Sequence, residues 1–364
     1  MNTMKAAVLN QPGDISLADV PVPTPTAGEA LVEVIACGVC GSDLARMLHK
    51  GTYRFPLICG HEFSGRVVEL GAEVTGVQIG DLVSVPPMIP CFRCDQCQQG
   101  RFSLCEDYDY FGSRRDGAYA QFVAVPATNL FRMPEGLDPR AAAMIDPAAI
   151  ALHALRRTKL TVGSKVCVVG AGPIGLFAVQ WARLSGAAEV VAIDLSDEKC
   201  KMAVQAGADH AERDRDSALS HAPDGFDVIF ESAGVPVAVD MAVSMAGRHG
   251  EVTFVGIPNA PVTLAEATFN RFLRFEISLH GAWNSFSAPF PGEEWTNAAH
   301  FLNRGDLAWE FMITHETGLD QVATLIPAMG ERSIFSSKVL FMPSNGQPAA
   351  PAEPDPDESP RPER

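Results

Sequence analysis

The segment 91–105, CFRCDQCQQGRFSLC, carries four of the nine cysteines of the chain in the pattern C-x2-C-x2-C-x7-C. Four thiolates at this spacing can surround one tetrahedral Zn²⁺ and leave no open position for a substrate. A redox-active CxxC pair and an iron–sulfur cluster are alternatives, but three evenly spaced cysteines followed by a fourth favour zinc. We therefore predict a structural zinc ion held by Cys91, Cys94, Cys97 and Cys105.

A second set of candidate metal ligands lies elsewhere in the chain. Cys40 follows an apolar segment in Cys-Gly-Ser-Asp, and His61 comes later in Gly-His-Glu. A thiolate and a neutral imidazole both suit Zn²⁺. Asp146 is the candidate third ligand, and Glu62 could ligate directly, exchange with water or lie behind the ligands. Three protein ligands and one exchangeable water would form an open, catalytic site.

Taken singly, these residues also have ordinary structural interpretations. A cysteine after a strand is usually part of the core, and a lone histidine is more often a hydrogen-bonded structural residue than a ligand. Asp146 stands before Pro147, where an aspartate is often a helix cap. The presence of all three ligands in one chain with the four-cysteine segment favours the metal.

The sequence 170–175, GAGPIG, matches the GxGxxG pattern of dinucleotide-binding turns. It follows the apolar segment KVCVV and opens a predicted helix, which is the context that the pattern requires. The first glycine permits the tight turn, the second leaves room for the pyrophosphate, and the third allows close packing of helix and strand. A glycine-rich turn without a ligand is the alternative. The predicted turn comprises Gly170, Gly172, Pro173, Ile174 and Gly175.

Asp194 ends the next predicted strand, 189–194. At this place a carboxylate accepts hydrogen bonds from the ribose hydroxyls and repels a 2′-phosphate. The chain continues Leu195-Ser196-Asp197 without an arginine. The sequence therefore favours NAD over NADP.

Two kinds of scaffold must position these motifs. In the first part of the chain, short apolar segments broken by turn residues predict the strands of a β-rich unit, and a helix then leaves it. Further on, apolar strands alternate with helical lengths, which predicts a doubly wound α/β domain with a parallel sheet. A last helix and strand are expected to return to the first unit. The predicted strands are 30–40, 62–71, 81–88, 165–172, 189–194, 227–234, 250–258, 276–283 and 337–342, and the predicted helices are 139–158, 173–186 and 293–306.

The charge of the chain limits its partners. The formal net charge is -16, and a surface of this sign repels nucleic acid and anionic membranes. No apolar segment is long enough to cross a bilayer, and the N-terminal segment does not resemble a secretory signal. We expect a cytoplasmic protein that binds neither nucleic acid nor membrane.

In this order and spacing, Cys40-Gly-Ser-Asp, Gly-His-Glu, the four-cysteine segment and the glycine turn resemble the zinc-containing medium-chain alcohol and polyol dehydrogenases. The resemblance covers about residues 4–342. It implies a GroES-like catalytic domain over 1–150, to which 291–342 return, and a Rossmann NAD-binding domain over 151–290. The remaining residues, 343–364, are Pro-rich and acidic and are predicted to be a disordered tail.

The resemblance also implies roles for single residues. Cys40, His61 and Asp146 would hold a catalytic zinc, Ser42 would begin a proton relay, and Asp43 would orient His61. Polyol dehydrogenases usually have glutamate where this chain has Asp146, so the shorter carboxylate could reach the metal through water. A homodimer or homotetramer is expected, since the edge strand 276–283 pairs across a two-fold axis in this superfamily.

The segments CFRCDQCQQGRFSLC, DYFGSRRDGAYAQF and GAWNSFSAPFPGEEW are most similar to the galactitol-1-phosphate 5-dehydrogenase subfamily. A phosphorylated substrate needs a cation, and Arg114 and Arg115 on a glycine-bounded turn are candidates, although a solvated turn is an equal alternative. Trp283 and Asn284 are candidates for the pocket wall. The rival functions are a dehydrogenase of an unphosphorylated polyol or diol and a non-catalytic dinucleotide-binding relative. The intact Cys40 and His61 disfavour the latter.

Overall fold

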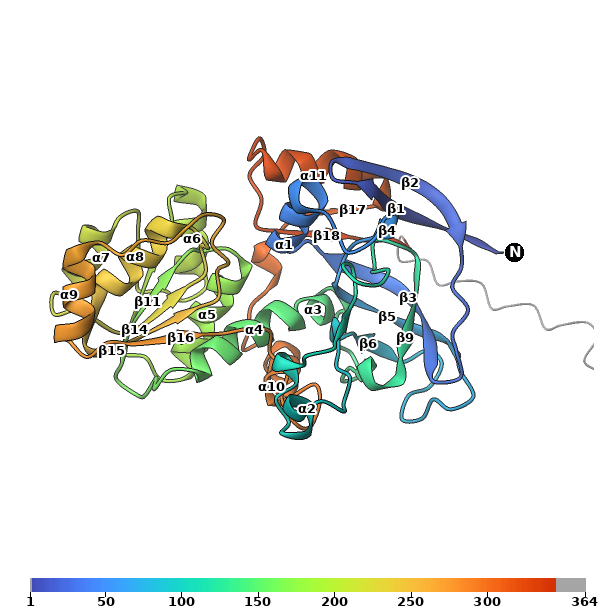
Figure 1. The fold of residues 1–364 in the computed structure, drawn as a ribbon, viewed down its shortest axis with the longest axis horizontal. Coiled ribbons are helices and arrows are strands. Elements are labelled where there is room, and N and C mark those ends of the chain that lie inside the picture. Colours follow the sequence, from blue (N-terminus) through green and yellow to red (C-terminus); the bar gives the residue numbers. More distant parts are fainter. Residues whose placement is uncertain (1, 345–364) are drawn as a thin grey trace, which may run out of the picture.

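The computed structural model describes residues 2–344 as two parts, one rich in antiparallel strands and one built on a parallel sheet (Figure 1). This is the fold class that the sequence predicts. Residues 345–364, which make up most of the predicted tail, lie outside the described residues. Within residues 2–344, no helix combines the length and the apolar character needed to cross a membrane.

The β-rich part centres on a sheet in the order β10-β6-β5-β3-β18-β17, with β9 (Phe122–Pro126) also pairing β3. Its most extensive pairing joins β3 (Glu29–Gly38) and β5 (Glu62–Leu70), which run antiparallel. The predicted strand 81–88 is shorter than expected, since β6 (Leu82–Ser84) ends before Pro86 and Pro87. Prolines lack the N–H that a central strand must donate. The short β10 covers Phe131–Arg132.

Two smaller sheets complete this part. In one of them, β1 (Thr3–Gln11) and β2 (Asp14–Pro21) form a hairpin that the sequence analysis did not predict. Strand β1 also pairs with β4 (Leu57–Ile58). The other sheet joins β7 (Met88–Ile89) to β8 (Asp109–Tyr110), and the cysteine loop with helix α2 (Asp95–Gln98) lies between them in sequence.

The predicted helix 139–158 is two helices, α3 (Pro139–Ala143) and α4 (Ile145–Arg156). Pro147 explains the break, because its ring has no N–H and clashes with the carbonyl group four residues earlier, that of Ala143. Helix α5 (Pro173–Leu184) belongs to the second part. The indole of its Trp181 donates a 2.9 Å hydrogen bond to the carbonyl oxygen of Ala148 on α4. This contact packs α4 onto the second part.

The second part is a six-stranded sheet in the order β13-β12-β11-β14-β15-β16, in which every pair is parallel. Strand β11 (Lys165–Val169), in the middle of this sheet, is almost entirely buried, as its apolar sequence predicts. The strands are β11 (Lys165–Val169), β12 (Glu189–Ile193), β13 (His210–Glu212), β14 (Phe226–Glu231), β15 (Ala246–Phe254) and β16 (Ser278–Gly281). The helices are α5 (Pro173–Leu184), α6 (Asp197–Gln205), α7 (Arg215–His221), α8 (Pro236–Met245) and α9 (Glu266–Arg274).

The C-terminal segment crosses back to the β-rich part (Figure 1). Helix α10 (Glu293–Arg304) packs against α4, and β17 (Ile313–Thr317) and α11 (Val322–Gly330) follow. The final strand, β18 (Lys338–Phe341), pairs with β3 so that Leu340 is opposite Gly38. This pairing places Lys338 near the end of β3.

Candidate active site

The ends of β3 and β5 bring two predicted ligands together. Gly38, the last residue of β3, is opposite Glu62, the first residue of β5, so Cys40 and His61 become neighbours. The ligand atoms of Cys40, His61 and Glu62 all lie within 4.8 Å of one another. Cys40 precedes helix α1 (Gly41–Ala45), where the Ser42 hydroxyl lies 3.3 Å from its Sγ. A thiolate, an imidazole and a carboxylate at this spacing fit zinc.

Asp43 is fully buried and contacts both predicted ligands. Its carboxylate lies 3.1 Å from Nδ1 of His61 and accepts hydrogen bonds from the backbone N–H of Cys40, from Arg46 and from the Tyr119 hydroxyl. Burial alone would raise the pKa of Asp43, but His61, Arg46 and the Cys40 N–H together lower it to about 2. An imidazole bound at Nδ1 by a carboxylate keeps Nε2 for a metal.

Glu62, at the start of β5, forms a buried ion pair with Lys338, at the start of β18. Its Oε2 lies 2.5 Å from Nζ of Lys338, which also donates a hydrogen bond to the carbonyl oxygen of Val39. A Cβ atom on Gly38 would come within 2.7 Å of the same carboxylate oxygen. A side chain at position 38 would therefore have to displace the Glu62 carboxylate.

Asp146 lies in the first turn of α4 and is buried. Burial and the neighbouring Glu62 raise the pKa of Asp146 to about 7, and His61 and Lys338 act in the opposite direction. Among the described residues, the cluster of candidate ligands whose ligand atoms lie within 4.8 Å of one another contains Cys40, His61 and Glu62, and it does not contain Asp146. The site thus holds two buried carboxyl groups beside Cys40 and His61.

The four cysteines of the loop converge on one point, with their sulfur atoms within 4.8 Å of one another. The backbone N–H of Cys91 points at the sulfur of Cys105 at 3.2 Å, and that of Cys94 points at the sulfur of Cys91 at 3.3 Å. Backbone N–H groups, those of Glu106 and Cys97 first, lower the pKa of Cys94 to about 6. Four converging thiols with N–H groups directed at the sulfurs fit a closed zinc site.

The glycine turn has the geometry of a nucleotide-binding turn. Gly170 has φ +97°, a conformation that L side chains rarely adopt. A Cβ on Gly172 would meet no atom within 4 Å, which leaves the space that a pyrophosphate needs, whereas one on Gly175 would clash with the Gly170 carbonyl oxygen. Pro173 and Ile174 form the first turn of α5, whose N–H groups can bind phosphate.

Asp194 follows β12 at the same edge of the sheet. One of its oxygens accepts a 2.9 Å hydrogen bond from the backbone N–H of Ala171 in the turn, and the other accepts one from Ser196. The carboxylate is therefore tied to the predicted phosphate-binding turn.

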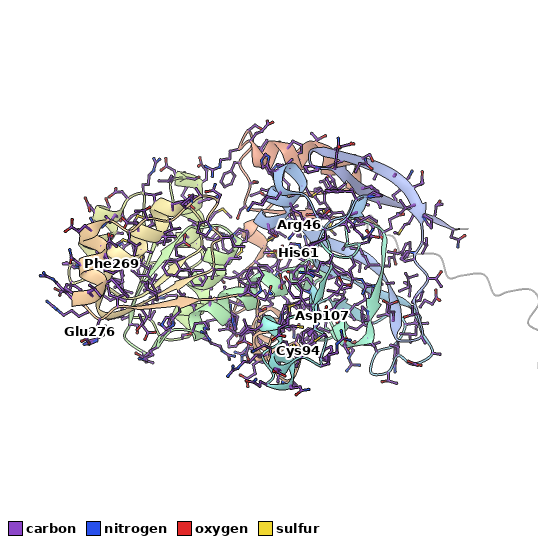
Figure 2. The ribbon with its side chains drawn as sticks, in the orientation of Figure 1. Arg46, His61, Cys94, Asp107, Phe269 and Glu276 are labelled. Carbon is purple, nitrogen blue, oxygen red and sulfur yellow. The ribbon has the colours of Figure 1, made fainter. Side chains whose placement is uncertain are left out.

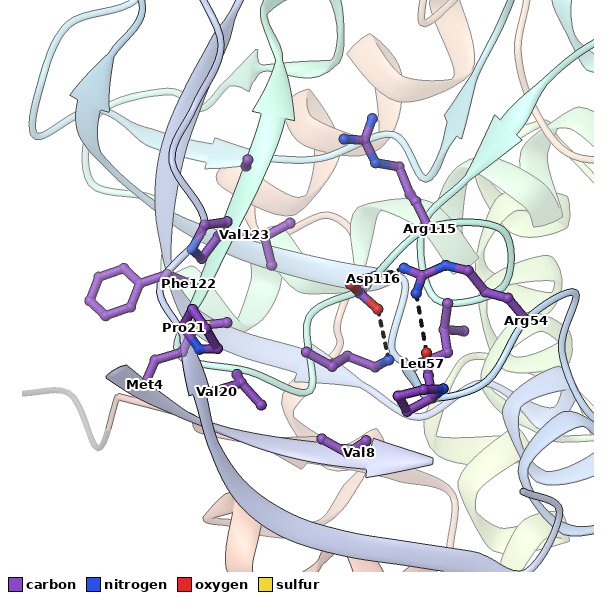
Figure 3. A pocket seen from close by; sticks show the side chains of 15 residues that line it. Met4, Val8, Val20, Pro21, Arg54, Leu57, Arg115, Asp116, Phe122 and Val123 are labelled. Carbon is purple, nitrogen blue, oxygen red and sulfur yellow. Dashed lines mark hydrogen bonds and ion pairs between the residues drawn. The ribbon is translucent and has the colours of Figure 1, made fainter. Parts of the chain in front are cut away.

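The two adjacent arginines have different environments. The guanidinium of Arg115 pairs with Glu29 at 3.0 Å and lies 3.8 Å from Asp109. It also borders a cavity of about 410 Å³ beside the β1–β2 hairpin, together with the ion pair Arg54–Asp116 (Figure 3). Neither Cys40 nor His61 lines this cavity. Arg114 instead lies against two tyrosine rings.

Trp283 and Asn284 follow β16, and Trp283 is about half exposed. The side-chain amide of Asn284 lies 3.6 Å from the sulfur of Met88. Met88 is opposite Tyr110 in the β7–β8 pair, and the Tyr110 ring packs edge-on against His61. Met88 and Tyr110 therefore lie between Asn284 and His61 in this series of contacts.

Sequence reasoning missed three residues of this site: Arg46, Tyr110 and Lys338. Arg46 pairs with Asp43 at 3.0 Å, and Asp43 also contacts His61 (Figure 2 labels Arg46 and His61). Arg46 comes six residues after Cys40, directly after the short helix α1, so its closeness to Asp43 in sequence could have been noticed. No local signal pointed to Lys338, since its partner lies 276 positions earlier in the chain.

Known proteins are similar to this chain over most of its length. Residues 26–135 match the alcohol dehydrogenase GroES-like domain, and residues 173–304 match the zinc-binding dehydrogenase family. The chain is 35% identical over 350 residues to galactitol 1-phosphate 5-dehydrogenase of Escherichia coli (strain K12), covering 93% of this chain and 100% of the relative. The crystal structure of galactitol-1-phosphate dehydrogenase from Escherichia coli superposes with a TM-score of 0.88 at 34% identity, over 93% of this chain and 100% of that chain.

Two further relatives are similar over most of their length. Sorbitol dehydrogenase of Bacillus subtilis (strain 168) is 32% identical over 332 residues, which cover 87% of this chain and 91% of the relative. A zinc-binding dehydrogenase from Sinorhizobium meliloti 1021, solved with NADP, has a TM-score of 0.85 at 32% identity, over 94% of this chain and 100% of that chain. With these matches along nearly its whole length, the chain belongs to the zinc-dependent medium-chain alcohol and polyol dehydrogenases and is an oxidoreductase.

Proposed function

We propose that the protein oxidises a secondary hydroxyl group of galactitol 1-phosphate with NAD, which yields tagatose 6-phosphate, NADH and a proton. The observation that carries this proposal is the convergence of Cys40, His61 and a buried carboxylate, close to a loop that carries Arg114. The similarity to the galactitol 1-phosphate enzyme supports the choice of substrate.

The catalytic zinc would be held by Cys40, His61 and a carboxylate of Asp146 or Glu62, and the structural zinc by Cys91, Cys94, Cys97 and Cys105. When bound, the catalytic ion supplies a Lewis acid that lowers the pKa of a substrate hydroxyl, and NAD accepts the hydride. Asp43 fixes the orientation of His61 through the 3.1 Å contact at Nδ1. Ser42, whose hydroxyl lies next to the Cys40 sulfur, is placed to carry the proton toward solvent.

NAD is the proposed coenzyme because Asp194 would repel a 2′-phosphate. Its Oδ2 accepts a hydrogen bond from the glycine turn, which supports a position beside the adenosine ribose of a bound coenzyme. Because the similar Sinorhizobium dehydrogenase was solved with NADP, the choice between NAD and NADP is tested by experiment.

A second candidate substrate is an unphosphorylated polyol such as sorbitol. The 32% identity to the Bacillus sorbitol dehydrogenase favours it, and the metal site would act on either substrate. The two candidates differ only in their need for a phosphate-binding cation.

The domain division 1–150 with 291–342, and 151–290, also belongs to this proposal, as do a homodimer or homotetramer and a cytoplasmic location. The exposed edge of β16 supports the oligomer, since Leu279 on this strand is partly uncovered. Light scattering of the purified protein measures the assembly directly.

The proposed function is tested by measuring NAD reduction at 340 nm with a panel of polyols and their 1-phosphates, before and after chelation. Activity with galactitol 1-phosphate that chelation abolishes and zinc restores is the expected result. Chelation-sensitive activity only with free polyols would replace the first candidate by the second. A zinc-loaded enzyme that oxidises no member of the panel would contradict both.

A further inference from the structure

The Arg114 guanidinium contacts the rings of two tyrosines. Its guanidinium carbon lies 4.4 Å from the centre of the Tyr53 ring and 4.3 Å from that of the Tyr108 ring. A guanidinium that packs on aromatic rings keeps its N–H donors at the edge of its plane. Nη2 donates a 3.4 Å hydrogen bond to the Tyr53 hydroxyl, and Nε is buried and has no hydrogen-bond partner among the described residues.

Arg115 provides the contrast within the same loop. Its edge donors face the carboxylates of Glu29 and Asp109, so its charge is already neutralised. An anionic ligand would have to displace these carboxylates. Arg114 forms no ion pair with a carboxylate among the described residues, so its positive charge is available to a phosphate group.

The loop that carries Arg114 is fixed to the metal site. Gly112 and Gly117 pack so closely on the backbone of Gly60 that a Cβ at either position would clash with it. Gly60 immediately precedes His61. The loop is therefore packed directly against the residue that precedes the predicted ligand His61.

Aromatic rings connect the two sites. Tyr110 lies edge-on to His61 with a centroid distance of 5.6 Å, and Tyr108 lies 6.3 Å from Tyr110. Arg114 rests on the far member of this series. Tyr110 and Tyr108 therefore form a continuous series of contacts between His61 and Arg114.

We propose that Arg114, clamped by Tyr53 and Tyr108, binds the phosphate monoester of the substrate and selects phosphorylated over free polyols. The inference rests on the proposed function, because it assumes a polyol bound at the metal site. A local cation is also needed for electrostatic reasons, since a chain of net charge -16 repels a dianionic substrate.

The test compares Arg114→Gln with the matched control Arg115→Gln, using kcat/KM for galactitol 1-phosphate and for galactitol. Loss of a charge-assisted contact is expected to lower the value for the phosphate ester by roughly 10- to 100-fold, mostly through KM, while the value for galactitol is unchanged. Arg115→Gln should leave both values near those of the wild type. An equal loss on both substrates, or an equal effect of the two variants, overturns the proposal.

The clamp is tested separately at Tyr53, which is largely exposed and so can be changed without loss of a core contact. Tyr53→Phe keeps the ring and should retain phosphate selectivity, whereas Tyr53→Leu should lose it several-fold. Full selectivity in Tyr53→Leu would show that the ring does not position Arg114.

Binding of inorganic phosphate, followed by calorimetry on the holoenzyme, separates this inference from the proposed function. Phosphate that binds the wild type and not Arg114→Gln supports the clamp even if no polyol is oxidised. Absence of phosphate binding to the wild type, or equal binding to both proteins, contradicts the clamp whatever the activity.

Discussion

The Asp43 carboxylate lies 3.1 Å from Nδ1 of His61, and both residues are buried. The contact sets which ring nitrogen remains for a metal, and Asp43 is in turn fixed by Arg46 and Tyr119. The contact therefore joins the short helix α1, which carries Asp43, to His61, directly before β5.

Asp43→Asn keeps the shape of the side chain and removes its charge. We expect zinc affinity at the catalytic site to fall by roughly 10- to 100-fold, the range for partners that orient a ligand histidine. Competition with a chromophoric chelator measures this affinity without relying on activity. Asp19→Asn, at an exposed surface pair with Lys5, is the control, and an affinity equal in the two variants would contradict the role.

Lys338→Met removes the partner of Glu62 inside the protein. An unpaired buried charge costs about 3–5 kcal/mol, so the melting temperature should fall markedly. The double variant Lys338→Met, Glu62→Gln should recover part of the loss, because no charge then remains unpaired. If the single variant melts like the wild type, the pair does not stabilise the fold.

The raised pKa of Asp146 predicts that the stability of the zinc-free protein depends on pH. This pKa is raised to about 7 in the folded state, while an unfolded chain has the usual value near 3.9. The folded state therefore binds more protons between these values, and stability falls as pH rises from about 4 to about 7, by up to about 4 kcal/mol. Denaturant unfolding at several pH values measures this, and Asp146→Asn should flatten the curve. An unchanged slope in Asp146→Asn would assign the dependence to another group.

Asp194→Ser should weaken NAD and admit NADP. Loss of hydrogen bonds to a charged acceptor corresponds to roughly a 10- to 100-fold rise in KM for NAD, and the 2′-phosphate is no longer repelled. Asp197→Ser, on an exposed pair with Arg213, is the control. A preference for NAD that survives in Asp194→Ser would point to another determinant.

Cys97→Ser should remove the structural zinc and keep the catalytic one. Zinc content is expected to fall from two ions to one per chain, with a lower melting temperature, because a closed site of this type stabilises its loop. Cys200→Ser, in a cysteine outside both predicted sites, should change neither quantity. Two ions per chain in Cys97→Ser would rule out this cysteine as a required ligand.

Much of the fold could be predicted because its signals are local. The apolar segment before Gly170, the glycine spacing and the helix after it define the start of the parallel sheet, and β11, α5 and β12 lie close to the predicted ranges. Two predictions failed where prolines interrupted a regular pattern. Pro147 divides the helix 139–158, and Pro86 and Pro87 shorten the strand 81–88.

The sequence by itself determined the chemistry available to this protein: four clustered thiols, a cysteine and a histidine with nearby carboxylates, and a turn that can bind phosphate. These follow from residue types and short spacings, which do not depend on the rest of the chain. The tertiary structure alone decided that Lys338 neutralises Glu62, and that Arg114 contacts two tyrosine rings while its neighbour Arg115 pairs with Glu29. The physical reason is that strand pairing and loop packing bring together residues far apart in sequence, and neither partner carries a local sign of the other.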